Sequence, residues 1–319
     1  MRISSDNIEK KIKAEALRLG FAYCGISRAE AVCEKDINFI ESWIKEGCQA
    51  DMSYLERNKD KRYDPQLLFE GTKSIISVAL NYYTAEERAQ NRIDVAKFAK
   101  VRDYHIVMKE RLHELFEFIS LLTAPKKRLS GRFFCDSAPM MERYLAWKSG
   151  MGWIGRNHCL IIPNLGSYIV LGELFLNIDL NADEPITGNC IGCDKCIQNC
   201  PTGALSFSNE EGRTHLDARK CLSFHTIESK EKIPNVYSTK LDGIVFGCDK
   251  CQSACPHNEN IPQSTVFSLL PVFADKNTDI LQNFSEEDFN IEFRESTIKR
   301  AGYNKLKQNI ESQKKNDRL

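Results

Sequence analysis

Eight of the thirteen cysteines lie between Cys190 and Cys255, and they constrain the fold of this chain more than any other feature. The surrounding segment, residues 181–262, also holds five of the ten prolines and few long apolar runs. Such a segment buries little apolar surface, so we expect its folding to depend on bound metal. Clustered thiols in a chain that begins without a secretory leader are more typical of metal ligands than of disulfides.

The spacing of these cysteines predicts iron–sulfur chemistry. The first run is C-x2-C-x2-C-x3-C-P from Cys190 to Pro201, which is the spacing of bacterial ferredoxins. The second run is less complete: Cys221 stands apart, and C-x2-C-x3-C-P follows from Cys248 to Pro256. In two-cluster proteins the last cysteine of a run binds the other cluster. This crossover predicts two [4Fe–4S] clusters, the first held by Cys190, Cys193, Cys196 and Cys255 and the second by Cys200, Cys221, Cys248 and Cys251.

A pair of zinc sites is the alternative, because C-x2-C pairs also bind zinc. Zinc sites do not usually include the x3-Cys-Pro step, and no histidine lies at the spacing of a zinc knuckle. Two cubane clusters therefore fit the pattern better. Clusters of this kind carry one electron each and need only part of the chain, so the remaining residues must hold an acceptor or bind a partner.

Residues 1–180 have the alternating pattern of an α/β or α+β domain. Apolar positions at helical spacing predict helices over residues 7–19, 104–122 and 139–149. Gly20 and Gly150 are expected to end the first and the last of these helices. Apolar runs with β-branched residues predict strands over residues 21–26, 73–82 and 132–135. Residues 167–180 are predicted as two strands, or as one strand with a bulge at Gly172, and the chain after Pro262 as helical.

Charge and hydropathy exclude several classes of protein. Forty-four basic residues balance forty-four acidic ones, which argues against a protein that coats nucleic acid without specificity. The sequence has no apolar run long enough to span a membrane and no apolar segment near its start that would act as a secretory signal. We therefore expect a cytoplasmic protein with no membrane partner.

Two linked segments resemble the signature of a known family. They are CDSAPMMER at residues 135–143 and SGMGWIGRN at residues 149–157, and they resemble the epoxyqueuosine reductases, cobalamin-dependent iron–sulfur enzymes of tRNA modification. Shorter stretches agree in the same order within residues 1–310: YLERN at 54–58, RYDP at 62–65, DYH at 103–105, CLSFHTIE at 221–228 and GCDKCQ at 247–252. Many members continue into a helical-repeat domain, whereas this sequence ends soon after residues 293–310, which resemble the entry to that domain.

The resemblance implies an α+β protein made of three parts. Residues 1–180 would form an α/β, nitroreductase-like domain that binds cobalamin and carries the catalytic site. Residues 181–265 would form a domain like a bacterial ferredoxin with two [4Fe–4S] clusters, and residues 266–319 would form a helical tail. Cobalamin would bind in its base-off form in the cleft between the first two parts.

The resemblance also implies a reaction. Cobalamin reduced through the two clusters would remove the epoxide oxygen of epoxyqueuosine at the wobble position of tRNA, giving queuosine in the last step of its biosynthesis. The change consumes two electrons and two protons and releases water. The partners implied are the anticodon stem-loop of the tRNA and an external electron donor such as a flavodoxin or ferredoxin, and the protein is expected to act as a monomer.

Asp136 is the residue that the family would use as proton donor. Its carboxyl group follows the apolar Phe133, Phe134 and Cys135, and such surroundings favour the protonated form. The competing interpretation is a helix N-cap, because Asp-Ser-Ala-Pro before a helix is a capping signature. Matching family segments further nominate cobalamin contacts, which are Arg57, the backbone near Ala99, Asp136, Ser223 and Asp249.

Histidines and basic runs carry weaker signals. Asp103-x-His105-x-x-Met108 resembles the D-x-H-x-x-G loop that supplies an imidazole to cobalt in other cobalamin proteins, but the glycine is absent. We therefore interpret His105 as a packed or capping residue at a helix start. Basic side chains with the potential to contact tRNA phosphates, or simply to form a solvated face, are Lys59, Lys61, Arg62, Lys126, Lys127, Arg128 and those of the tail.

Two other functions compete with the tRNA enzyme. A non-catalytic electron carrier fused to a docking domain would explain the clusters but not the Asp136 motif. A cobalamin-dependent reductive dehalogenase would share the chemistry, but such enzymes usually carry an export signal. Because corrinoid binding is expected of both enzymes and not of the carrier, a spectrum would separate the carrier from the other two.

Overall fold

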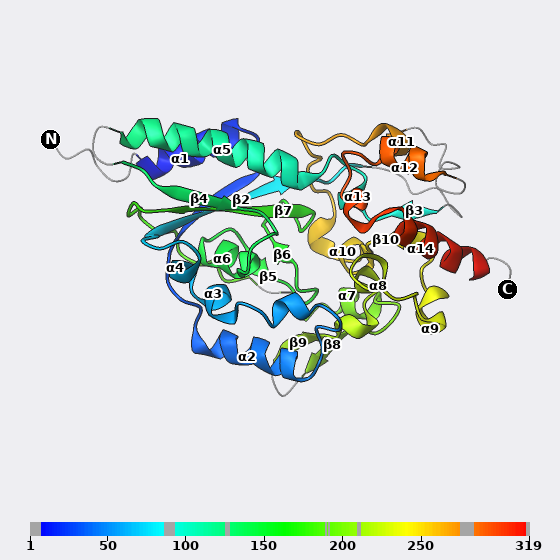
Figure 1. The fold of residues 1–319 in the computed structure, drawn as a ribbon. Coiled ribbons are helices and arrows are strands. Elements are labelled where there is room, and N and C mark those ends of the chain that lie inside the picture. The colour runs from blue at the N-terminus through cyan, green and yellow to red at the C-terminus, as the bar shows by residue number, and fades with distance from the viewer. Residues whose placement is uncertain are drawn as a thin grey trace.

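The fold is α+β and is built on one antiparallel sheet. A computed structural model describes residues 8–85, 93–124, 128–188, 190, 192–208, 212–274 and 284–316. Four strands lie in the order β1-β2-β7-β4, and every pair is antiparallel (Figure 1). Their bounds are Tyr23–Arg28 for β1, Ser74–Asn81 for β2, Ile169–Leu176 for β7 and Gly131–Phe134 for β4. These positions confirm the predicted strands.

Strand β2 is central and buried along its whole length. All eight of its residues are buried, because helices cover both faces of the sheet. This explains why its sequence is a continuous apolar run rather than an alternation of apolar and polar residues. β2 pairs with β7 over eight positions, from Ser74 opposite Leu176 to Asn81 opposite Ile169.

The predicted bulge at Gly172 is wrong. β7 is one strand with an unbroken register, and Gly172 lies opposite Val78. The glycine serves helix packing, because a Cβ atom at this position would lie 2.5 Å from Met108 Sδ. The missing side chain therefore lets the helix that carries Met108 pack closely on β7.

Helices α1 (Ile8–Arg18) and α5 (Tyr104–Thr123) cover one face of the sheet, the upper face in Figure 1. Both agree with their predicted spans, and Gly20 has a φ of 89° in the turn that follows α1. Side chains at helical spacing form the core under them and have no exposed surface: Ile12, Met108, Leu112, Leu115 and Ile119.

The other face carries α2 (Glu34–Lys45), α3 (Lys59–Tyr63), α4 (Pro65–Leu68) and α6 (Glu142–Lys148). The predicted helix over residues 139–149 is thus shorter than expected and begins at Glu142. Its N-cap residue is Met141, which makes no side-chain capping bond. The N-cap interpretation of Asp136 is therefore wrong, because five residues lie between Asp136 and the first residue of the helix.

The cysteine-rich segment folds into short elements beside the sheet. Its helices α7 (Lys195–Gln198) and α10 (Lys250–Ser253) lie near each other, and β8 (Leu205–Ser208) forms a hairpin with β9 (Arg213–Leu216). The remaining elements are η4 (Ala218–Lys220), α8 (Leu222–Ile227), α9 (Asn235–Ser238), β10 (Ile244–Phe246) and η5 (Pro256–Asn258). None of these short elements can bury a core by itself.

The C-terminal helices share a core with distant parts of the chain. β3 (Asp94–Val95) pairs in parallel with β10, and the helices are α11 (Pro271–Ala274), α12 (Glu286–Glu292), α13 (Ile298–Ala301) and α14 (Tyr303–Asn316). Val95, Phe246, Phe293 and Leu306 belong to one buried cluster. Packing thus crosses both expected domain boundaries, and the division at residues 180 and 265 stays a prediction.

The remaining short elements connect the sheet with the cysteine-rich segment. They are the helical turns η2 (Ser53–Leu55) and η3 (Lys97–Ala99) and the small antiparallel pair β5 (Trp153–Ile154) and β6 (Leu160–Ile161). Among the described residues we find no helix with the length and apolar character needed to cross a membrane.

Candidate functional site

Several of the eight clustered cysteines lie near other members of their predicted set. In the first set, burial and the nearby Cys190 and Cys255 raise the pKa of Cys196 to about 11. In the second set, burial and the nearby Cys221 and Cys200 raise the pKa of Cys248 to about 12. In the same way, burial and the nearby Cys193 raise the pKa of Cys255, and burial and the nearby Cys248 raise the pKa of Cys251. The fold therefore brings these members of each predicted set near one another, while the assignment itself stays a prediction.

The local chemistry of these cysteines fits iron–sulfur clusters. All eight are free thiols. Backbone N–H groups already point at two of the sulfurs, because Arg156 N lies 3.4 Å from Cys190 Sγ and Ala204 N lies 3.3 Å from Cys200 Sγ. Hydrogen bonds of this kind stabilise thiolates and help to set cluster potentials.

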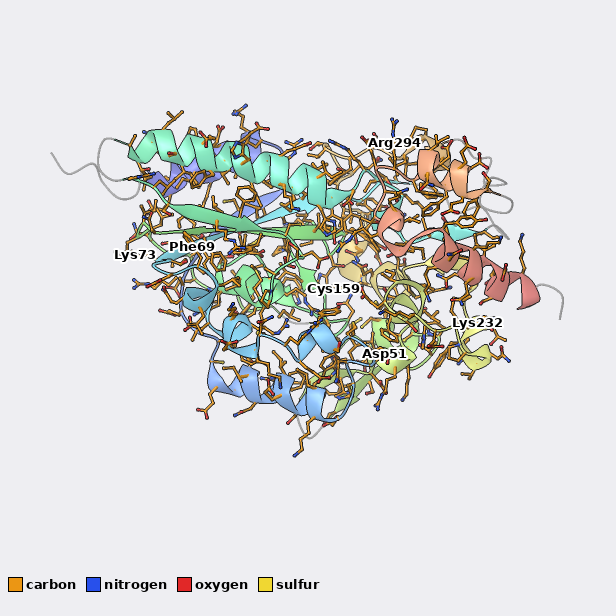
Figure 2. The ribbon with its side chains drawn as sticks, viewed as in Figure 1. Asp51, Phe69, Lys73, Cys159, Lys232 and Arg294 are labelled. Atoms are coloured by element: carbon orange, nitrogen blue, oxygen red, sulfur yellow. The ribbon has the colours of Figure 1, made fainter. Side chains whose placement is uncertain are left out.

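Cys159 was not singled out from the sequence, yet it lies between the two sets. It follows the β5 strand, and Figure 2 shows it where the sheet meets the cysteine-rich segment. Burial raises the pKa of Cys159 to about 11, and the nearby Asp249, Cys255 and Cys196 add to this increase. The spacing of Cys159 gave no signal, because it stands alone in the sequence among apolar residues.

Asp136 lies in the loop between β4 and α6 with its side chain half exposed. Its backbone has a φ of 55°, a left-handed conformation that aspartate and asparagine tolerate better than most residues. The Tyr104 hydroxyl donates to Asp136 Oδ2 at 3.1 Å, and His105 Nε2 lies 3.3 Å from the same oxygen. Two residues at the start of α5 thus hold this carboxylate.

His105 connects Asp136 to a second carboxylate. Its Nδ1 lies 2.7 Å from Asp103 Oδ1, and Asp103 also caps α5 by accepting from the backbone N–H of His105. Partial burial lowers the pKa of His105, but its hydrogen bonds to Asp103 and Asp136 outweigh this effect and raise the pKa overall. The predicted position of His105, packed at the start of a helix, is therefore confirmed. Its imidazole ring also contacts Asp136, which the prediction did not include.

Arg300 enters the same site from the C-terminal tail. Its Nη1 lies 2.7 Å from His105 Nε2 and 3.8 Å from Asp136 Oδ2. The backbone carbonyl of Glu295 accepts from Asp103 N, which fixes the tail against the start of α5. The basic tail was predicted either to contact tRNA phosphates or to form a solvated face, and its Arg300 lies beside Asp136.

Two glutamates lie behind the Asp136 loop, Glu142 partly buried and Glu173 fully buried, and sequence reasoning missed both. Glu142 Oε1 accepts from Asp136 N at 2.6 Å. Burial raises the pKa of Glu142 to about 7, and the Asp136 carboxylate also contributes. Glu173 on β7 has no exposed surface, and burial together with the neighbouring Glu142 raises its pKa well above the ordinary value. A signal existed for Glu173, which is the single charged residue in the apolar run IVLGELFL.

The η2 turn lies across from Asp136. Burial raises the pKa of Tyr54 to about 12, and the Glu228 and Asp136 carboxylates contribute to this increase. Glu228 follows α8 of the cysteine-rich segment, so three different parts of the chain meet near Asp136. The predicted cobalamin contact Arg57 is exposed next to this turn, and its carbonyl accepts from Arg62 Nη2 at 3.4 Å.

The other predicted cobalamin contacts lie near one another. Asp249 Oδ2 accepts from Lys97 N at 2.7 Å, which ties the cysteine-rich segment to the η3 turn that contains Ala99. Ala99 is buried, and its carbonyl accepts from Ser296 Oγ at 3.1 Å. Ser223 lies in the first turn of α8, directly after the cluster ligand candidate Cys221. These placements bring Asp249 and the Ala99 turn together, and the cobalamin roles stay predictions.

The basic residues predicted to contact RNA have different surroundings. Lys59 pairs with Glu41 at 2.5 Å, and Arg62 Nη2 binds the carbonyl of Tyr54 at 3.0 Å, so both are engaged by the protein itself. Lys61 is exposed. Lys126 and Lys127 lie outside the described residues, and Arg128 lies at the edge of the described part.

Comparisons with known proteins agree along the whole chain. Residues 62–137 match the family model for "Epoxyqueuosine reductase QueG, DUF1730", and residues 189–258 match a "4Fe-4S double cluster binding domain". The chain is 39% identical over 302 residues to the epoxyqueuosine reductase of Cellulophaga algicola, a match that covers 94% of this chain and 96% of that protein. The enzyme of the same name from Leadbetterella byssophila is 37% identical over 304 residues, and the match covers 94% of this chain and 96% of that protein.

Solved structures share the fold. A selenomethionine-labelled epoxyqueuosine reductase superposes with a TM-score of 0.86 at 25% identity, over 98% of this chain and 82% of that one. Another epoxyqueuosine reductase, crystallised with an epoxyqueuosine-modified tRNA stem-loop, gives a TM-score of 0.82 at 24% identity, again over 98% of this chain and 82% of that one.

Proposed function

Because the chain belongs to the epoxyqueuosine reductase family of oxidoreductases, we propose that it reduces epoxyqueuosine to queuosine at the wobble position of tRNA. The observation that carries the proposal is the match to an enzyme of this name over 94% of the chain. The geometry around Asp136 supports it, because a half-exposed carboxylate is held there by a hydroxyl, an imidazole and a guanidinium. The reaction needs two electrons and two protons, and this chain contains candidate residues for the transfer of both.

Electrons would enter through the cysteine-rich segment, which matches the double-cluster domain. We propose that Cys190, Cys193, Cys196 and Cys255 hold one [4Fe–4S] cluster and that Cys200, Cys221, Cys248 and Cys251 hold the other. The backbone N–H groups of Arg156 and Ala204 would stabilise the cluster thiolates. An external one-electron donor, such as a flavodoxin or ferredoxin, would supply both electrons in sequence.

Cobalamin in its base-off form is the proposed second cofactor, and when bound it would supply the strong reductant that epoxide cleavage needs. Its contacts would be Arg57, the backbone near Ala99, Asp136, Ser223 and Asp249. One observation fits a group rich in amides: within the described part of the chain, the buried Asn157 Nδ2 has no hydrogen-bond partner. Other buried polar atoms in the described residues also lack partners, and an amide-bearing ligand beside residues 149–157 would satisfy this one.

Asp136 would donate a proton to the epoxide oxygen as the carbon–oxygen bond breaks, and a second proton would complete the water that leaves. Tyr104, His105 and Arg300 would position the carboxyl group through the contacts described above. Glu142 would hold the loop, because it accepts the backbone N–H of Asp136 itself. General acid catalysis of this kind requires a carboxyl group within hydrogen-bond reach of the oxygen that it protonates.

The anticodon stem-loop of tRNA is the proposed substrate, which is supported by the related enzyme crystallised with a modified tRNA stem-loop. Substrate tRNA is found in the cytoplasm, so we propose that the protein works there. We further propose that it acts as a monomer. The three structural parts proposed for these roles remain residues 1–180, 181–265 and 266–319.

Replacement of Asp136 by Asn tests the catalytic assignment sharply. Asparagine is isosteric with aspartate and also tolerates the left-handed backbone at this position, so the loop is expected to keep its conformation. Single turnover with pre-reduced cobalamin removes electron supply as a limit. We expect Asp136→Asn, once loaded with cobalamin, to keep both clusters and to slow single turnover by about 10²–10⁴-fold, the usual contribution of a general acid.

Asp288→Asn is a matched control, because Asp288 is an exposed capping residue of α12 far along the chain from the site. The control is expected to turn over at the wild-type rate. A near wild-type rate for Asp136→Asn would show that Asp136 is not the proton donor. The positioning roles proposed for the surrounding residues would then fall with it.

A further inference from the structure

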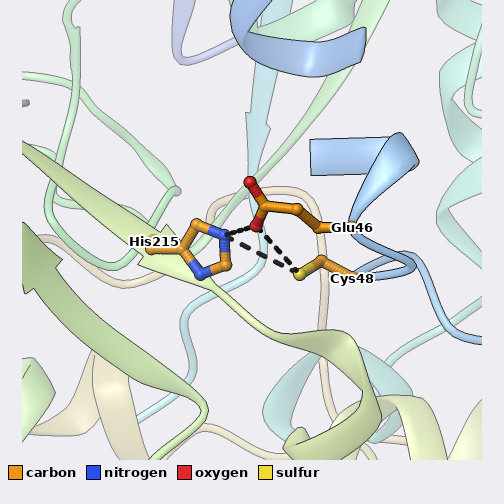
Figure 3. Close-up of side chains that lie close together, drawn as sticks. All are labelled: Glu46, Cys48 and His215. Carbon is orange, nitrogen blue, oxygen red and sulfur yellow. Dashed lines mark hydrogen bonds and ion pairs between the residues drawn. The ribbon is translucent and has the colours of Figure 1, made fainter. Parts of the chain in front are cut away.

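A cysteine, a histidine and a glutamate meet at a place that the proposed reaction does not use. Glu46 is the residue directly after helix α2, Cys48 follows two residues later, and His215 lies on strand β9 of the cysteine-rich segment (Figure 3). The three potential ligand atoms all lie within 4.8 Å of one another. None of the three is among the eight cysteines predicted to hold the clusters or the residues around Asp136.

The distances between these atoms match the edges of a tetrahedral metal site. Cys48 Sγ lies 3.7 Å from His215 Nε2 and 3.9 Å from Glu46 Oε2, and His215 Nε2 lies 3.2 Å from Glu46 Oε2. Zinc bonds of about 2.3 Å to sulfur and about 2.0–2.1 Å to nitrogen or oxygen, at tetrahedral angles, place ligand atoms about 3.3–3.6 Å apart. Shifts of a few tenths of an ångström would therefore complete three corners of a zinc tetrahedron.

Other contacts hold the two ligand-bearing segments together without help from these three side chains. Trp43 Nε1 on α2 donates to the carbonyl of Leu216, the residue after His215. Ala218 N donates to the carbonyl of Cys48 at 2.9 Å, and Arg213 pairs with Asp36 at 3.4 Å. A metal ion at this place would meet ligands that are already positioned, which reduces the entropy lost on binding.

The surroundings favour a borderline divalent ion. Cys48 is 1% exposed, His215 is partly buried, and the Glu46 side chain is largely exposed, so the fourth position would open to solvent and take a water molecule. Thiolate and imidazole ligands select zinc-like ions over magnesium or calcium. Arg219 Nη2 lies 3.7 Å from Cys48 Sγ, and Asp217 Oδ1 accepts from Arg219 Nε at 2.8 Å.

We propose that Glu46, Cys48 and His215 bind a zinc-like divalent ion that is separate from the iron–sulfur clusters and joins the end of α2 to strand β9. The ion would sit beside the turn at residues 217–221, which leads into the cluster ligand candidate Cys221. Its role would be structural, as a clamp between the sheet domain and the cysteine-rich segment. The proposal does not depend on the reaction proposed above.

The test measures zinc and iron together in the full-length chain after its clusters have been reconstituted without oxygen. Zinc is added in the presence of a competing chelator, and both metals are counted per chain. The wild-type protein is expected to retain one equivalent of zinc. Cys48→Ser and His215→Gln are each expected to lose this zinc while they keep the wild-type iron content. His215 lies partly exposed on a hairpin, so its variant is expected to fold even if the buried Cys48 variant does not.

Cys33→Ser provides the matched control. Cys33 precedes α2, and its sulfur lies 3.1 Å from Asp36 Oδ2, so it resembles Cys48 but lacks a histidine partner. This control is expected to bind zinc like the wild type. Absorption at the zinc edge is expected to show one sulfur neighbour, with nitrogen and oxygen in the other positions.

Three results would overturn the proposal. The first is a wild-type protein that retains no zinc against the chelator, which would leave the three side chains as a hydrogen-bonded cluster only. The second is unchanged zinc binding in His215→Gln. The third is a zinc spectrum with three or four sulfur neighbours, which would place the ion in a vacant cluster site.

Discussion

Glu142→Gln gives a quantitative test of the acidic pair behind the Asp136 loop, which consists of the partly buried Glu142 and the fully buried Glu173. The pKa of Glu142 is raised from 4.5 to about 7, chiefly because burial disfavours the charged carboxylate. A carboxyl group whose pKa is raised in the folded state stabilises the fold fully below its unfolded pKa and loses that contribution as the pH rises through the folded value. The interval between 4.5 and about 7 corresponds to at most about 3 kcal/mol.

Glutamine resembles the protonated glutamate at every pH and keeps the oxygen that accepts from Asp136 N. The free energy of unfolding of Glu142→Gln, relative to the wild type, is therefore expected to rise with pH between about 4.5 and 7 and to level off above 7. Between pH 5.5 and pH 8 the increase is expected to be about 2 kcal/mol at most.

Urea unfolding of the reconstituted protein, followed without oxygen at several pH values, measures this difference. Glu117→Gln on the exposed side of α5 is the control and is expected to show no such pH dependence. A difference between Glu142→Gln and the wild type that stays constant from pH 5.5 to pH 8 would refute the reasoning. It would mean that Glu142 is ionised in the folded protein throughout this range.

Three further predictions concern the clusters, cobalamin and the sheet. Cys200→Ala is expected to lower the iron content from about eight to about four per chain, because only the second cluster loses a ligand; paramagnetic resonance that finds the first cluster missing instead would contradict the crossover. Asp249→Asn is expected to weaken the retention of cobalamin during gel filtration while the iron content stays constant, and unchanged retention would remove Asp249 from the contacts. Gly172→Ala is expected to destabilise the fold by about 1–3 kcal/mol, because its Cβ would overlap Met108; an unchanged melting temperature would contradict the close packing of α5 on β7.

Strong periodicity made most of the sheet domain predictable. The buried run over residues 74–81 and the amphipathic run over residues 104–123 are long, so their patterns determine the type of element. The start of α6 was mispredicted because Pro139 suits a first helical turn, whereas the chain uses residues 136–141 to shape the Asp136 loop. The pairing of β3 with β10 could not be predicted, since strands of two or three residues have no detectable period.

The candidate site was predictable where chemistry fixes spacing. The two cysteine sets are predicted from the spacing that a cubane requires and stay a prediction, while in the fold Cys196 lies near Cys190 and Cys255, and Cys248 lies near Cys221 and Cys200. Glu142, Arg300 and Cys159 were not singled out, because each reaches the site through a tertiary contact that leaves no local pattern. Glu173 is different, since a single carboxylate inside an apolar strand is costly to bury and is itself a signal.

The most direct measurement of the central claim is the conversion of tRNA-bound epoxyqueuosine by the reconstituted protein. Purified chain with both clusters and cobalamin would be mixed with tRNA that carries epoxyqueuosine and with an excess of a low-potential reductant, and the nucleosides would be quantified by mass spectrometry. Our account predicts that epoxyqueuosine is lost and an equal amount of queuosine appears, and that Asp136→Asn slows this conversion. Epoxyqueuosine that remains unchanged, with full iron and cobalamin content in the protein, would contradict the proposed function.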